Sequence, residues 1–166
     1  MANTYKLISS VTVGSTSVAN MEFTSIPATF TDLLLKISCR NDRSGSLNDA
    51  VTLQFNGDSS GSGKRIFGNG EAVTNGSARY VIDNGPTSTA NTFANIEFYI
   101  PNYRTSLNKT YSADGAMENN ATTAFTTLVA GIWTSSAAIT SIRIVEEVSS
   151  NFVQYSTAYL YGIKNS

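Results

Sequence analysis

Residues 33–40, with the sequence LLLKISCR, show the pattern that decides the fold. The odd-numbered positions of this stretch carry apolar side chains, namely Leu33, Leu35, Ile37 and Cys39. Polar residues alternate with them at Lys36, Ser38 and Arg40. Because successive side chains of a β-strand point to opposite faces, this alternation predicts a strand with one face in a hydrophobic core.

The same period of two recurs along the chain in short segments separated by Gly, Asn, Asp and Ser. It is clearest over 51–55, which ends at the turn dipeptide Asn56-Gly57, and over 94–100, which stops at Pro101. Less regular strand segments are expected over 5–13, 21–23, 80–82, from 111 onward, and over 125–133, 139–145 and 152–163. The first two of these read as a hairpin, and the irregular spacing over 139–145 suggests a β-bulge.

These segments predict an all-β chain folded as a two-sheet antiparallel β-sandwich, with jelly-roll topology as the preferred arrangement. The chain has 166 residues, the size of one domain, and no linker divides it, so we expect a single domain over 1–166. The segment 56–76 lacks alternation and contains six glycines. We therefore expect an exposed excursion there.

Composition and charge argue against several partners. Eleven Lys and Arg residues against twelve Asp and Glu give a formal net charge of −1, and the basic residues are scattered, so a nucleic-acid partner is not expected. No apolar run approaches the ~20 residues of a membrane helix, and the N-terminal residues lack the order of a signal peptide. We expect synthesis in the cytosol and no membrane partner. The single cysteine, Cys39, excludes an internal disulfide.

The usual chemistry of an active site is missing from the sequence. Without any histidine, the commonest general base and zinc ligand are absent. Cys39 shares the parity of the apolar positions and reads as a core residue. The adjacent acids Glu146 and Glu147 should point to opposite faces of a strand, as solvated edge charges, and so do not form a glycosidase pair. Asp42, Asp49 and Asp58 lack the regular spacing of a calcium loop. The sequence therefore predicts no enzyme, no metal and no cofactor.

Two strand segments are apolar on both parities, over 125–133 and 152–163. A strand that buries both faces in a two-layer sandwich needs a cover from outside the domain, and a neighbouring subunit would supply it. The alternative is that these strands lie centrally under a long loop. The candidate contact residues are Trp133, Phe152, Tyr159, Leu160 and Tyr161.

Tyrosines also suggest a rival role. Tyr99 and Tyr103, together with Tyr161, would form a platform on which sugar rings stack. The ordinary enrichment of tyrosine in β-strands explains the same residues without any ligand.

Several short segments, spread over nearly the whole length of the chain, resemble a family of tailed-bacteriophage virion proteins. The resemblance is carried by strand and turn segments, namely Ile26–Leu33, Leu53–Asp58, Phe98–Tyr103, Glu118–Thr122 and Tyr159–Asn165. It implies a component of a phage particle, such as a capsid decoration protein, or else a tail or fibre component. It transfers no functional residue.

The functional expectation is therefore a decoration (cement) protein on the outside of a phage capsid, which stabilises the shell by binding the assembled lattice. Its expected partners are the major capsid protein and copies of itself, as a homotrimer, and its expected location is the virion. The alternative is a glycan-binding or receptor-binding module of the tail or fibre. An enzyme ranks third.

Overall fold

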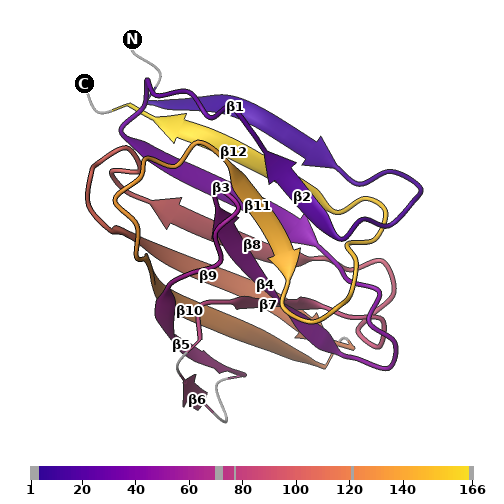
Figure 1. Ribbon diagram of the computed structural model, residues 1–166. Coiled ribbons are helices and arrows are strands. Elements are labelled where there is room, and N and C mark those ends of the chain that lie inside the picture. Colours follow the sequence, from indigo (N-terminus) through magenta and orange to yellow (C-terminus); the bar gives the residue numbers. More distant parts are fainter. Residues whose placement is uncertain (1–3, 70–72, 77, 121, 165–166) are drawn as a thin grey trace.

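The computed structural model describes residues 4–69, 73–76, 78–120 and 122–164. These residues contain no helix, and their twelve strands form two antiparallel sheets (Figure 1). The predicted all-β, two-sheet sandwich is confirmed.

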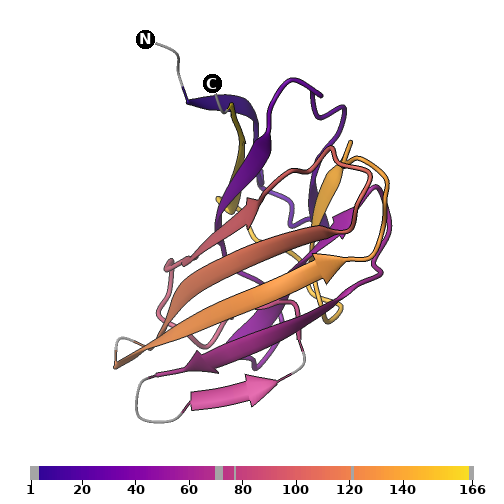
Figure 2. The ribbon, with the colours of Figure 1, turned by 90° about the vertical axis from the view of Figure 1, so that its left-hand side faces the viewer.

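The large sheet has eight strands, and its strand order is far from the chain order. From one edge to the other it contains β1 (Tyr5–Thr12), β12 (Thr157–Ile163), β3 (Asp32–Cys39), β8 (Ala94–Ile100), β9 (Lys109–Asn119), β10 (Thr123–Trp133), β5 (Ser62–Gly68) and β6 (Val73–Gly76). Figure 2 shows the β5–β6 hairpin at the end of the molecule opposite the two termini. The termini lie together because β1 and β12 are paired neighbours.

The small sheet has four strands and packs against the inner face of the large one. Its order is β2 (Asn20–Phe23), β11 (Ile142–Glu146), β4 (Asn48–Phe55) and β7 (Val81–Asn84). β7 contacts β8, β9 and β10, so the small sheet ends above the middle of the large sheet. β5 and β6 therefore extend beyond the small sheet.

The core lies between the sheets, where the alternation predicted it. In β3, the side chains of Leu33, Leu35, Ile37 and Cys39 are at most 2% exposed. In β8 the inward side chains of Ala94, Ile96, Phe98 and Ile100 are fully buried. Burial of such side chains contributes roughly 1.5–3 kcal/mol each, which makes this layer the main source of stability. Cys39 is a core residue, as predicted.

The segment 56–76, expected as an exposed excursion, contains two paired strands, β5 and β6, among its described residues. β5 pairs with β10 along its whole length. Its inward side chains are Arg65, which lies 4.2 Å over the Tyr80 ring, and Phe67, which stacks on Phe125 at 6.1 Å. Because an arginine occupies its inner face, β5 shows no alternation of apolar and polar residues in the sequence. Its pairing with β10, and not its local sequence, makes it a strand.

The expected hairpin of 5–13 with 21–23 is wrong, because β1 belongs to the large sheet and β2 to the small sheet. The expected bulge over 139–145 is also absent, since β11 keeps a continuous register with both neighbours. A register shift occurs instead in β1, where Leu7 pairs with Tyr161 but Ser9 pairs with Leu160. Ile8 is thus an extra residue in β1, and the strand changes parity there.

Candidate functional site

The outer face of the large sheet carries the exposed apolar side chains of the strands. In the described part of the chain, every strand residue of this kind lies on that sheet: Tyr5, Leu7, Ile66, Tyr99, Leu128 and Tyr159. The outer face of the small sheet is polar by comparison, with an ion pair between Arg143 Nη2 and Glu22 Oε2 at 3.3 Å. The two outer faces of the sandwich therefore differ in character, and the large sheet presents the better surface for a partner.

Four tyrosines gather on the β1–β12–β3–β8 half of this face. We call this area the tyrosine face and define it by the residues Tyr5, Leu7, Leu34, Tyr99, Tyr159 and Tyr161. Tyr5 is 58% exposed, Leu7 49%, Tyr159 39% and Tyr99 37%. Leu34 forms the floor, because its side chain is only 8% exposed.

Strand register explains why these residues meet. Leu34 is opposite Tyr161 on one side and opposite Tyr99 on the other, and Leu7 is opposite Tyr161. These four residues form one row across four strands, and side chains in one row point to the same face. Tyr159 lies in the next row, opposite Lys36.

Polar groups frame the tyrosines. Lys36 Nζ lies 2.7 Å from Glu97 Oε2, and the hydrogen bond and charge of Glu97 raise the pKa of Lys36. The Tyr99 hydroxyl donates to Asp32 Oδ2 at 2.9 Å, and this hydrogen bond, followed by burial, raises the pKa of Tyr99. A shallow hollow of about 360 Å³ lies among Tyr5, Leu34, Lys36, Glu97 and Tyr161. Rings and hydrogen-bonding groups are therefore available to one bound surface or ligand.

The bulge in β1 creates part of this face. Tyr5 and Leu7 share a sequence parity with Val11, which packs against the core. Because Ile8 is an extra residue, Tyr5 and Leu7 turn outward while Val11 turns inward. Sequence reasoning placed Tyr5 and Leu7 in one regular strand and missed their exposure, because period-two alternation does not reveal a single inserted residue.

Three of the five predicted contact residues have no surface to offer a partner. Trp133 is 2% exposed, and Phe152 and Leu160 are fully buried. Trp133 packs on Phe55 with ring centroids 5.5 Å apart and donates from Nε1 to Asp58 Oδ2 at 2.8 Å. The second apolar parity of the 152–163 segment therefore fills the chain's own core. Only Tyr159 and Tyr161 remain on the outer face.

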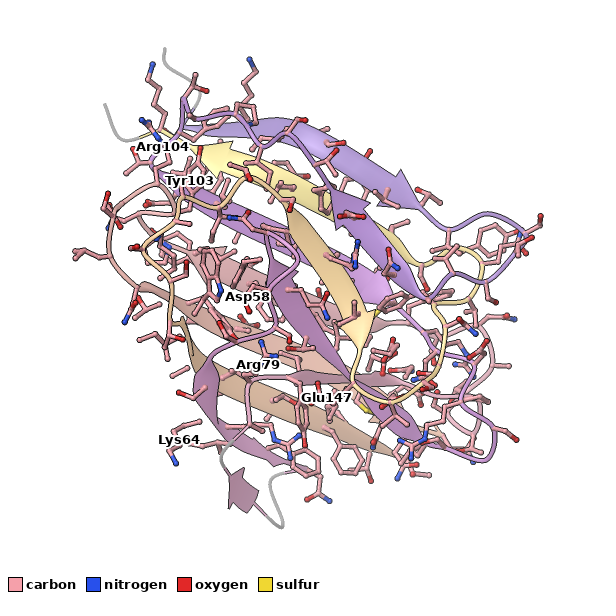
Figure 3. All side chains as sticks on the ribbon, in the orientation of Figure 1. Asp58, Lys64, Arg79, Tyr103, Arg104 and Glu147 are labelled. Carbon is pink, nitrogen blue, oxygen red and sulfur yellow. The ribbon has the colours of Figure 1, made fainter. Side chains whose placement is uncertain are left out.

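Tyr103 is not part of a glycan platform. It lies in the loop after β8, is 1% exposed, and donates its hydroxyl hydrogen bond to the carbonyl of Pro27 (Figure 3). Tyr99 lies on the surface, so it does not share a face with the buried Tyr103. The structure brings Tyr99 together with Tyr161, and with Tyr5 in place of Tyr103.

The predicted acids do not cluster as a metal site. Asp42 accepts hydrogen bonds from the Asn151 main-chain N–H and amide, whereas Asp49 accepts from the Ser150 hydroxyl at 2.6 Å. Asp58 accepts from Ser60, and this hydrogen bond is the main cause of its lowered pKa. Among the residues with described positions, no group of three His, Cys, Asp or Glu side chains could hold a metal ion.

Glu146 departs from the prediction of a solvated edge charge. Glu147 is exposed, but Glu146 points between the sheets, and neither of its carboxylate oxygens has a hydrogen-bond partner in the ordinary ionised form. Burial first, and then the nearby charge of Asp83, raises the pKa of Glu146 to about 10. Burial raises the pKa of Asp83 to about 7, and Asp83 Oδ2 is also without a partner. Burial and mutual repulsion therefore favour a proton held between the two carboxyls at neutral pH.

Comparisons with known proteins add no relative: no family model, no curated protein and no solved structure matches the chain. The described residues also include no helix that is long and apolar enough to cross a membrane. The resemblance to phage virion proteins therefore stays a prediction from the sequence.

Proposed function

We propose that the protein is a structural component of a tailed-phage virion, a decoration protein that binds the outside of the capsid shell through the tyrosine face. The single observation that carries this proposal is the concentration of exposed apolar side chains on one face of one sheet. Interfaces are enriched in tyrosine because its ring is large, rigid and apolar while its hydroxyl still forms hydrogen bonds. The proposal assigns no catalytic step to the chain.

The order of the strands supports this setting. Four strands of the large sheet, β1-β12-β3-β8, face the four of the small sheet, β2-β11-β4-β7. In chain order β1 to β4 alternate between the sheets, and the hairpins β5–β6 and β9–β10 add strands to the large sheet only. We propose that these eight strands form a jelly roll with two inserted hairpins. Jelly rolls are common in viral capsid proteins and in lectins.

Binding to a lattice explains how a modest contact would stabilise a shell. A ligand that binds only the assembled state favours that state by mass action, and many copies act together. The proposed partners are the major capsid protein and further copies of this chain. The homotrimer expected from the sequence stays a prediction.

The test uses particles that lack the protein. Purified chain is added to undecorated particles, and bound copies are counted by quantitative mass spectrometry after sedimentation. Hundreds of copies per particle are expected for a shell protein, and a handful would overturn the proposal in favour of a tail location.

Substitutions then examine the surface. The double variant Tyr5→Ser, Tyr159→Ser should lower particle binding at least tenfold. Tyr155→Ser is the matched control, because Tyr155 is 68% exposed but lies in the loop before β12. Equal binding by both variants would contradict docking through the tyrosine face.

A second candidate function is a glycan-binding module of the tail or fibre. The observation that favours it is the hollow of about 360 Å³, where Tyr5 and Tyr161 lie beside the Lys36–Glu97 ion pair. Its size is at the lower end of the range for small-ligand sites. A glycan array with purified protein, repeated with Tyr5→Ser, separates the two functions: tyrosine-dependent sugar binding together with a low copy number supports the tail module.

A further inference from the structure

A second exposed apolar area lies on the outer face of the large sheet, where β5, β10 and β9 run side by side. We call it the β10 patch and define it by Lys64, Ile66, Asp114, Leu128 and Ala130. Ile66 and Leu128 are each 52% exposed and lie opposite each other in register. This patch is centred on β10, whereas the tyrosine face is centred on β12 and β3.

The β10 patch has a ridge and a hollow. Ile66, Leu128 and Asp114 form one row across the three strands, and Lys64, Ala130 and Ser112 form the next row. The second row has small side chains at Ala130 and Ser112, and a hollow of about 390 Å³ opens among the two rows. The two large apolar side chains of the first row therefore stand beside a space that could receive side chains of similar size.

The charges of the patch are arranged at its two ends. Lys64 is exposed on β5, and Figure 3 shows its side chain directed away from the core at the edge of the molecule. Asp114 lies on β9, on the other side of β10 and one row away. Asp114 is opposite Glu97, a like charge, and takes part in none of the ion pairs found in the described part of the chain.

Asp114 is poorly compensated within its own chain. Burial and the charge of Glu97 raise its pKa, and Lys36, which opposes this effect, is already bound to Glu97. Like charges that face each other across strands are destabilising. A cation from a partner would relieve this repulsion.

We infer that the β10 patch is an isologous contact between two copies of this chain. A two-fold axis that runs through the apolar ridge in the plane of contact brings Lys64 of each copy to Asp114 of the other. The same rotation places Ile66 and Leu128 of one copy against Leu128 and Ile66 of the second copy. Each contact occurs twice, as two-fold symmetry requires.

The expected dimer is weak. Three strands and about seven residues along each give a patch of roughly 15 Å by 25 Å, which is below the ~800 Å² per partner of a standard interface. Contacts of this size class are weak and transient, so we expect a dissociation constant of roughly 10 to 500 µM. On a crowded particle surface, the local concentration of bound copies would exceed this range.

The association state is measured by sedimentation velocity from about 5 to 500 µM. A reversible monomer–dimer equilibrium is expected. A monomer over the whole range would overturn the inference. A trimer would overturn it as well and would support instead the homotrimer expected from the sequence, because a closed ring of three requires a heterologous contact.

Charge exchange tests the pairing itself. Lys64→Glu and Asp114→Lys should each abolish self-association, because both pairs in the symmetric contact become repulsive. A mixture of the two variants should restore it, because both pairs between unlike partners are then attractive. The proposed pairing is supported if the mixture forms a dimer while each variant by itself stays monomeric. A mixture that also stays monomeric contradicts the pairing.

The apolar part has its own variant and control. Leu128→Asn should weaken the dimer at least tenfold, whereas Leu107→Asn should leave it unchanged, because Leu107 is 71% exposed in the loop before β9 and lies outside the patch. Circular dichroism verifies that each variant is folded. The dimer and the docking to a shell can fail separately. A monomeric variant that still binds particles would leave the proposed function intact. A dimeric protein that binds no particle would refute the proposed function and leave the dimer standing.

Discussion

Replacing Glu146 with Gln should stabilise the protein at neutral and alkaline pH and leave it almost unchanged at low pH. Glutamine keeps the shape of the side chain and can donate to Asp83 as the protonated acid does. In the parent, folding forces Glu146 to take up a proton, because burial raises its pKa to about 10 from an ordinary value of 4.5. Glutamine has no proton to take up.

The sign of the pH dependence follows from the direction of this shift. A group with a raised folded-state pKa binds more protons in the folded state, so stability is present below the unfolded pKa and is lost as the pH rises towards the folded pKa. The loss is at most about 1.4 kcal/mol per pH unit for one proton. Between pH 5 and pH 7, Glu146→Gln should therefore gain about 2 to 3 kcal/mol relative to the parent.

Urea unfolding, followed through the fluorescence of the buried Trp133, measures this difference at pH 5, 6, 7 and 8. Glu147→Gln is the control, because it removes the neighbouring carboxyl from an exposed position. A stability difference between Glu146→Gln and the parent that stays constant from pH 5 to pH 8 would refute the reasoning, since no proton uptake at position 146 would then accompany folding.

Other substitutions test the packing. Gly131→Ala should destabilise by about 1 to 3 kcal/mol, because a β-carbon there would lie 2.1 Å from the Tyr111 ring, whereas Gly14→Ala, with nothing within 4 Å, should change thermal stability little. Tyr103→Phe should cost about 1 to 2 kcal/mol in urea unfolding, because it leaves a carbonyl oxygen without its hydrogen-bond partner. Cys39 should react with a thiol reagent only after unfolding, since it is fully buried and burial raises the pKa of its thiol; rapid labelling of the folded protein would contradict this.

The layers of the fold could be predicted from the sequence, but the pairing of the strands could not. Alternation identified β3, β4 and β8 with the correct inward residues, because each has one apolar face. It did not identify β5, where an arginine faces inward, and it did not show that β1 and β2 enter different sheets. Strand order depends on contacts between residues far apart in the chain, which a local pattern does not contain.

The sequence predicted the exposure of candidate site residues correctly where inward and outward positions alternate regularly along a strand. It failed where they do not. Tyr159 and Tyr161 were expected at a surface and lie there. Trp133 was also expected at a surface, but it lies in the core, because an aromatic residue on a strand gives no sign of which layer covers it. No sequence pattern singled out Lys109, a lysine that is 1% exposed and donates to the main-chain carbonyls of Leu107 and Ser135.

The register shift at Ile8 has a consequence for the evolution of this surface. Val11, in one half of β1, packs against the core, while Tyr5 and Leu7, in the other half, lie in the tyrosine face. A single inserted residue, encoded by one codon, separates the two halves. Deleting that codon would give β1 one regular period and turn Tyr5 and Leu7 away from the outer face in one step. Among homologous chains, the presence or absence of the extra residue should therefore mark which of them share the tyrosine face.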